Sequence, residues 1–148
     1  MGSRPRKPGR SESSPHVDYW TLAELRYSIR RFLRTRELAA RAAGIAPQQY
    51  LVLLQLKGLE GKQRATVGML AERLQLRHHT TVELVDRLVS GKLVAREPEG
   101  REVTVKLLPA AEAILMKLAA YSIAELQTEG PALVAVLQRL IREKKSRS

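Results

Sequence analysis

The sequence predicts a mainly α fold in one domain that carries one small β-hairpin, and two patterns of apolar residues and the chain length support this prediction. Apolar residues recur at helical spacing over most of the chain from residue 18 onward. Residues 93–107 instead hold two short strand signals on either side of a Gly-containing turn, and the second of them, residues 102–107, alternates apolar and polar residues. The 148 residues are enough for a single domain whose core needs no disulfide bond or structural metal.

The first helix is predicted over residues 18–43, where apolar side chains recur at helical spacing and arginines fall mostly on the other side. Gly44 is expected to end this helix. Pro47 then restarts a helix at its first position, and this second helix is expected to end at Gly58.

Two further helices are predicted on either side of a short turn. Thr66 is a candidate N-cap for a brief helix that ends near Leu74. The helix after Leu76 ends at Gly91 and turns its apolar side chains inward. Polar side chains are left on its outer face: His79, Thr80, Glu83, Asp86 and Arg87.

A hairpin follows at once, with strands at residues 93–97 and 102–107 joined by a tight turn at residues 98–101. The helical period returns after Pro109, and Gly130-Pro131 is expected to break it into two helices. Two helices joined by a short turn and followed directly by a hairpin are the layout of a winged helix-turn-helix, here at residues 47–107.

Positive charge is concentrated at the two ends of the chain, whose formal net charge is +11. Residues 1–17 hold four basic residues against one acidic residue, and residues 139–148 hold five against one. The body is therefore mildly basic, and total charge alone is a weak argument for nucleic acid. Because residues 1–17 are also rich in Pro, Gly and Ser, we expect a disordered basic arm there and one domain over residues 18–148.

Composition excludes several classes of site. The chain has no cysteine, which excludes thiolate nucleophiles, Cys-ligated zinc, iron–sulfur clusters and disulfide-stapled secretion. Its three histidines are too few and too scattered for a zinc site. No apolar run approaches the ~20 residues of a membrane span, and the N-terminus lacks the apolar stretch of a signal peptide. We expect a cytoplasmic protein with no metal, no cofactor and no membrane contact.

Four segments together resemble the MarR family of bacterial transcriptional regulators over about residues 20–143. They are GIAPQQYLVLL at 44–54, VGMLAERL at 67–74, VELVDRLV with GKLVAR between 82 and 96, and EGREVTVKL at 99–107. The resemblance implies a homodimer whose first and last helices, at residues 18–45 and 109–145, intertwine. It also implies that the helix at residues 78–90 lies in the major groove of double-stranded DNA, that the protein represses transcription, and that a small aromatic or anionic effector releases it.

Polar residues around this helix are the predicted DNA contacts. Arginine reads guanine or binds phosphate, imidazole and hydroxyl groups reach bases or phosphates, and glutamate accepts from cytosine N4. The alternative for each is a solvated surface residue, and Arg87 has the further alternative of an ion pair with Glu83 one turn earlier. The predicted DNA-binding residues are Thr66, Arg77, His78, His79, Thr80, Glu83, Arg87 and Arg101.

Effector-binding residues are predicted from the amphipathic aromatics and the arginine series of the first helix. Aromatic rings bury a large apolar surface, and an arginine attracts an anion. The alternative is core packing for the aromatics and a solvated face for the arginines. The predicted effector-binding residues are Trp20, Tyr27, Arg30 and Tyr50.

Enzymatic function is not expected, because residues 58–62 lack the spacing of a phosphate-binding loop and no Gly-x-Ser-x-Gly elbow occurs. The leading hypothesis is a homodimeric, sequence-specific repressor that binds a pseudo-palindromic operator. The alternative is a dimeric protein-interaction module of the same fold that does not read DNA. A short wing, the acidic Glu83 and the modest charge of the body keep this alternative open.

Overall fold

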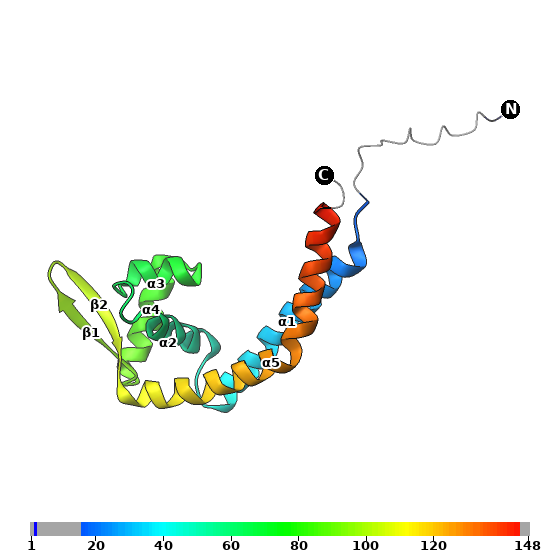
Figure 1. The fold of residues 1–148 in the computed structure, drawn as a ribbon. Coiled ribbons are helices and arrows are strands. Elements are labelled where there is room, and N and C mark those ends of the chain that lie inside the picture. Colours follow the sequence, from blue (N-terminus) through cyan, green and yellow to red (C-terminus); the bar gives the residue numbers. More distant parts are fainter. Residues whose placement is uncertain (1, 3–15, 146–148) are drawn as a thin grey trace.

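The computed structural model describes residue 2 and residues 16–145. In this part of the chain five helices accompany one two-stranded antiparallel sheet (Figure 1). The predicted arm at residues 1–17 lies outside the described residues except for Gly2, His16 and Val17. The elements are α1 (Tyr19–Ala42), α2 (Pro47–Leu59), α3 (Val67–Leu74), α4 (His78–Ser90), β1 (Val94–Glu99), β2 (Glu102–Leu107) and α5 (Pro109–Lys145).

The first four helices begin and end within about one residue of the predicted positions. Pro47 is the first residue of α2, as its fixed φ and missing N–H favour. The Thr66 hydroxyl accepts a hydrogen bond from the backbone N–H of Met69 at 3.1 Å, so Thr66 is the N-cap of α3. Gln75 adopts the left-handed conformation at the end of α3, which turns the chain within three residues into α4.

The hairpin, which we call the wing, is tighter than predicted. Pro98 and Glu99 belong to β1 and pair with Val103 and Glu102, so the turn is reduced to two residues. Gly100 has φ of +66°, a conformation that glycine adopts without strain and that matches the first position of a type II′ turn. A proline is tolerated in β1 because a two-stranded sheet leaves each strand with an unpaired edge.

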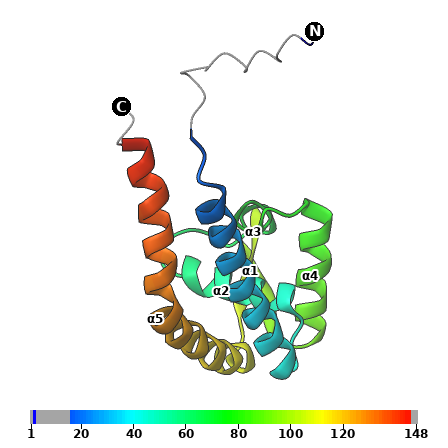
Figure 2. The ribbon, with the colours of Figure 1, turned by 90° about the vertical axis from the view of Figure 1, so that its right-hand side faces the viewer.

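The predicted break at Gly130-Pro131 is wrong, because α5 runs continuously from Pro109 to Lys145 with Pro131 inside it. A proline inside a helix removes one backbone hydrogen bond and favours a kink, but it does not end a helix that packs well on both sides. α5 does change direction along its length (Figure 1). Its first part packs beneath the winged helix-turn-helix, and its second part runs beside α1 (Figures 1 and 2).

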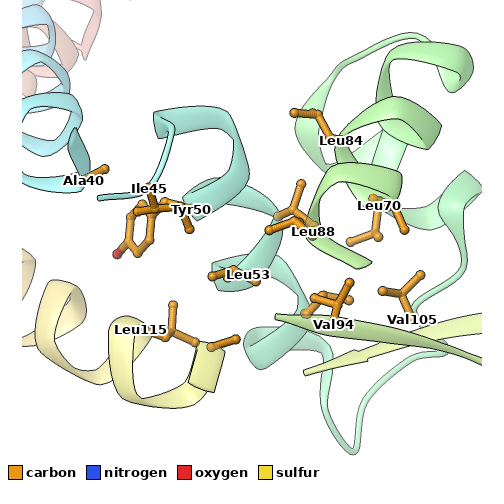
Figure 3. Packing of buried hydrophobic residues seen from close by; sticks show 14 of the residues in the cluster. Ala40, Ile45, Tyr50, Leu53, Leu70, Leu84, Leu88, Val94, Val105 and Leu115 are labelled. Atoms are coloured by element: carbon orange, nitrogen blue, oxygen red, sulfur yellow. The ribbon is translucent and has the colours of Figure 1, made fainter. Parts of the chain in front are cut away.

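The core joins the winged helix-turn-helix to the ends of α1 and α5 that meet it. Leu53 of α2 and Leu88 of α4 are fully buried, and Val94 and Val105 close the core from the base of the wing (Figure 3). The Val105 N–H donates to Ala65 O at 2.9 Å, which fastens the wing to the start of α3. The orientation of α4 and the wing is therefore set by burial of apolar surface.

Beyond this core, α1 and the second part of α5 rise as a pair of helices (Figure 1). The Arg36 guanidinium forms an ion pair with Glu125 and also donates to the Ser122 hydroxyl, and Arg31 lies 3.8 Å from Glu129. These contacts hold two helices that leave many large apolar side chains exposed, which shows that the pair has an uncovered apolar surface. None of the described helices is long and apolar enough to cross a membrane.

We predict that stability depends on the ionisation of Asp18, the N-cap of α1. The Thr21 hydroxyl and backbone N–H donate to its carboxylate at 2.6 and 3.0 Å, and Arg139 of α5 lies 3.4 Å away. The hydroxyl bond, then the backbone bond and then the arginine hold the pKa of Asp18 below its usual value. The resulting stabilisation is complete above about pH 4 and is lost as the pH falls through the lowered pKa.

Urea unfolding of the wild type and of Asp18→Asn at pH 7 and at pH 3 measures this effect. The wild type should be the more stable protein at pH 7, and the difference should shrink at pH 3. A difference that stays constant between the two pH values would contradict the prediction.

Candidate nucleic-acid interface

The outward face of α4 gathers the polar side chains predicted to contact DNA. His78, His79, Glu83 and Arg87 are exposed, and Thr80 is half-buried. Within the described residues, none of these five side chains makes a hydrogen bond or an ion pair with another side chain. The structure therefore does not contain the ion pair between Arg87 and Glu83 that was the alternative to DNA contact. Both groups keep their full capacity to bind something outside the chain.

The inward face of α4 fixes that orientation. Leu84, Val85 and Leu88 are buried in the core, and so is Thr81. The Thr81 hydroxyl donates to the carbonyl oxygen of Arg77 at 3.0 Å, so the buried polar group has a partner. Because four successive inward positions are buried, rotating α4 to present another face would expose the core.

Arg77 and Thr66 precede the two helices of the helix-turn-helix. Arg77 is the residue before α4, is exposed, and uses no side-chain atom to cap the helix. Thr66 is half-buried, and its hydroxyl oxygen is committed to capping α3. Its backbone also forms a bridge with Thr104 of β2, which places the start of α3 against the wing. Thr66 can therefore still donate its hydroxyl proton, but its first role is structural.

An ion pair that the sequence reading did not identify connects α4 to the wing. Arg96 of β1 donates to Asp86 of α4 at 2.6 Å. The signal was available in principle, because β1 begins only four residues after α4 ends and so must run back past its last turns. The pair ties α4 to the hairpin, and it neutralises a carboxylate on the face that carries the predicted DNA contacts.

The remaining charges of the wing largely cancel one another. Lys106 lies 3.5 Å from Glu97 across the hairpin, and Arg64 of the preceding loop lies 3.2 Å from Glu102. Among the described residues Arg101, which occupies the second position of the turn, is a wing cation with no ion-pair partner. The tip of the wing therefore presents a free guanidinium beside an exposed Glu99.

The structure does not gather the four predicted effector residues into one site. Trp20 and Tyr27 lie on α1 and are 71% and 58% exposed, and Arg30 is exposed one turn beyond Tyr27. Tyr50 is 6% exposed and packs near Ile45 in the core (Figure 3). A small recess of about 40 Å³ lies between α1 and α5, and none of the four residues lines it.

Comparison with known proteins agrees with this geometry. A sequence model described as the MarR family matches residues 43–102, which span α2 to the start of β2. The fold is similar to a MarR family protein from Bacillus stearothermophilus, at 25% identity and a TM-score of 0.64, with 88% of this chain and 97% of that chain covered. Residues 43–102 thus match the MarR family, and the whole fold is similar to that of a winged helix-turn-helix protein of this family.

Two further structures show the same fold as this chain. MepR, a transcription regulator of the Staphylococcus aureus multidrug efflux pump MepA, has 18% identity and a TM-score of 0.70, with 85% of this chain and 98% of MepR covered. A MepR mutant bound to an oligodeoxyribonucleotide has 18% identity and a TM-score of 0.61, with 85% and 97% covered. No curated protein matches the chain by sequence.

We predict that the Asp86–Arg96 pair restrains the wing. Arg96→Ala should speed amide hydrogen exchange in β1 and β2 by up to about fivefold, the effect expected of an exposed ion pair. Arg101→Ala is the matched control, because it removes the same charge from the wing without breaking an ion pair among the described residues. Equal acceleration in both variants, or none in Arg96→Ala, would show that the pair does not restrain the wing.

Proposed function

We propose that this protein is a homodimeric repressor that binds a pseudo-palindromic operator in double-stranded DNA, with α4 of each subunit in the major groove. The observation that carries the proposal is the outward face of α4, where imidazole, hydroxyl and guanidinium groups have no partner within the described chain. Such groups are the ones that bind base edges and phosphates. Because the rigid core fixes this face, it can meet a groove without rearrangement.

The uncovered apolar surface of α1 and α5 supports the dimer. Large exposed apolar surfaces on a protein of this size mark contact with another macromolecule. A second copy of the chain is the occupant that also supplies the second α4 required by a two-fold symmetric operator. The exposed apolar residues of the two helices include Trp20, Leu22, Tyr27, Leu33, Tyr121, Ile123, Leu126, Val134, Leu137 and Ile141.

We further propose that a small effector binds the exposed face of α1 and releases the protein from DNA. Tyr27 and Arg30 are exposed on α1 next to the residues that line the recess between α1 and α5. A small aromatic anion bound on this exposed face of α1 would stack on the ring of Tyr27 and pair with the guanidinium of Arg30. Because α1 and α5 also connect to the winged helix-turn-helix through the core, such a ligand would bias the spacing of the two α4 helices in the dimer. Tyr50, buried in the core, has a packing role.

A second candidate function is a dimeric interaction module that does not read DNA. The near-neutral wing favours it, because residues 94–107 hold three acidic and three basic residues. A wing of this charge contributes little to the electrostatic attraction that dominates DNA affinity. The two functions differ in whether the free arginines near α4 and at the wing tip affect binding to DNA.

We predict that Arg87→Ala and Arg101→Ala each weaken DNA binding and reduce the slope of log affinity against log salt by about one. Fluorescence anisotropy with a labelled duplex, selected from genomic fragments at increasing salt, measures both quantities. Lys117→Ala on α5 is the control for loss of one positive charge away from α4, and its slope should match the wild type. Unchanged affinity and slope in both arginine variants would favour the interaction module.

We predict that the protein is a dimer with twice the 16.6 kDa mass of the chain and that Leu137→Asp yields a monomer. A buried carboxylate in an apolar interface costs several kcal/mol, enough to dissociate a dimer at micromolar concentration. Val103→Asp introduces the same charge at an exposed valine of the wing and should remain dimeric. Sedimentation velocity distinguishes the species, and a monomeric wild type would contradict the proposal.

A further inference from the structure

Glu83 is an unusual residue for the middle of a DNA-facing helix, because its carboxylate carries the same charge as DNA. α4 holds two acidic residues, Glu83 and Asp86, and only Asp86 has an ion-pair partner among the described residues. Asp86 is neutralised by Arg96 of the wing at 2.6 Å. Glu83 is exposed and has no ion-pair or hydrogen-bond partner among the residues that the structure describes. The acid at position 83 is therefore left available on the outward face.

Arg87, the nearest cation along the helix, does not neutralise it. Glu83 and Arg87 are four residues apart in the orientation that favours an ion pair on a helix, yet no such pair forms. His79 lies one turn before Glu83, so three side chains with free polar groups follow one another along the same face. Four residues of helix rise about 6 Å, a distance that spans fewer than two base-pair steps. Glu83 and Arg87 can thus reach the same base pair or adjacent ones.

An unpaired carboxylate in the major groove is tolerated only where the DNA offers it a hydrogen-bond donor. It loses water on entering the groove and is repelled by the phosphates, so any site without a donor is penalised. The major groove presents amino donors on cytosine N4 and adenine N6. The adenine amino group lies between two acceptors, N7 of the same base and O4 of the paired thymine, which repel a carboxylate. The cytosine amino group has an acceptor on one side only.

We propose that Glu83 is a specificity-determining residue that selects a C·G pair in each half-site by accepting a hydrogen bond from cytosine N4, while Arg87 binds guanine. The inference rests on the proposed function, because it assigns a base preference to the same α4 face. The carboxylate acts mainly by excluding sites that lack this donor. It therefore improves the discrimination between sites more than it raises the affinity for the best one.

The experiment is selection of duplexes from a library randomised over both half-sites, with the wild type, Glu83→Gln and Glu99→Gln compared. Glutamine keeps the size of glutamate but carries a donor as well as an acceptor, a combination that matches adenine. Glu99→Gln is the matched control, because Glu99 is also exposed and unpaired among the described residues but lies at the wing tip.

The wild type should enrich cytosine at one position of each half-site by about tenfold or more over other bases. Glu83→Gln should lose that preference or exchange it for adenine, and Glu99→Gln should retain it while binding all sequences somewhat more tightly. A wild-type site whose base preferences are unchanged in Glu83→Gln overturns the assignment of Glu83 and leaves the proposed function standing. A wild-type selection that enriches no sequence overturns both.

Discussion

The structure depends on burial of the inner face of α4 against α2 and the base of the wing. Leu53, Leu88 and Val94 are almost completely removed from water where these elements meet. Burial of each large apolar side chain stabilises the fold by about 1.5–3 kcal/mol, whereas the ion pairs on the surface contribute at most about 1 kcal/mol each. The position of every outward residue of α4 therefore follows from the apolar contacts behind it, and the Asp86–Arg96 pair refines the wing on a framework already set.

α1 and the second part of α5 bury their apolar side chains less completely. There the two helices meet through the Arg36–Glu125 and Arg31–Glu129 pairs, while leucines, valines and aromatic rings remain exposed. A single chain buries the apolar core of its winged helix-turn-helix but leaves apolar side chains of α1 and α5 exposed. A second subunit that covers this surface would also fix the separation of two α4 helices, so one apolar interface would serve both stability and the geometry of DNA recognition.

Local sequence rules predicted most of the elements, because their signals are local. Pro47 and Thr66 begin helices through their own φ angle or hydroxyl group. The errors occur where contacts distant in sequence decide the outcome. Pro131 reads locally as a break, but packing of α5 on α1 carries the helix through it. The Asp86–Arg96 pair was missed because it joins two different elements. The outward face of α4, by contrast, was predicted, because helical periodicity alone shows which positions face inward. Which of its residues bind DNA depends on a partner that the chain does not contain.

Hydroxyl-radical footprinting of the purified protein on an operator selected from genomic DNA tests directly whether a dimer presents two α4 helices to the duplex. A rigid pair of α4 helices held by a dimer predicts two protected half-sites on one face of the duplex, about one helical turn apart and related by two-fold symmetry. A single protected half-site, or weak protection spread evenly along the fragment, would contradict recognition of DNA by a two-fold symmetric dimer.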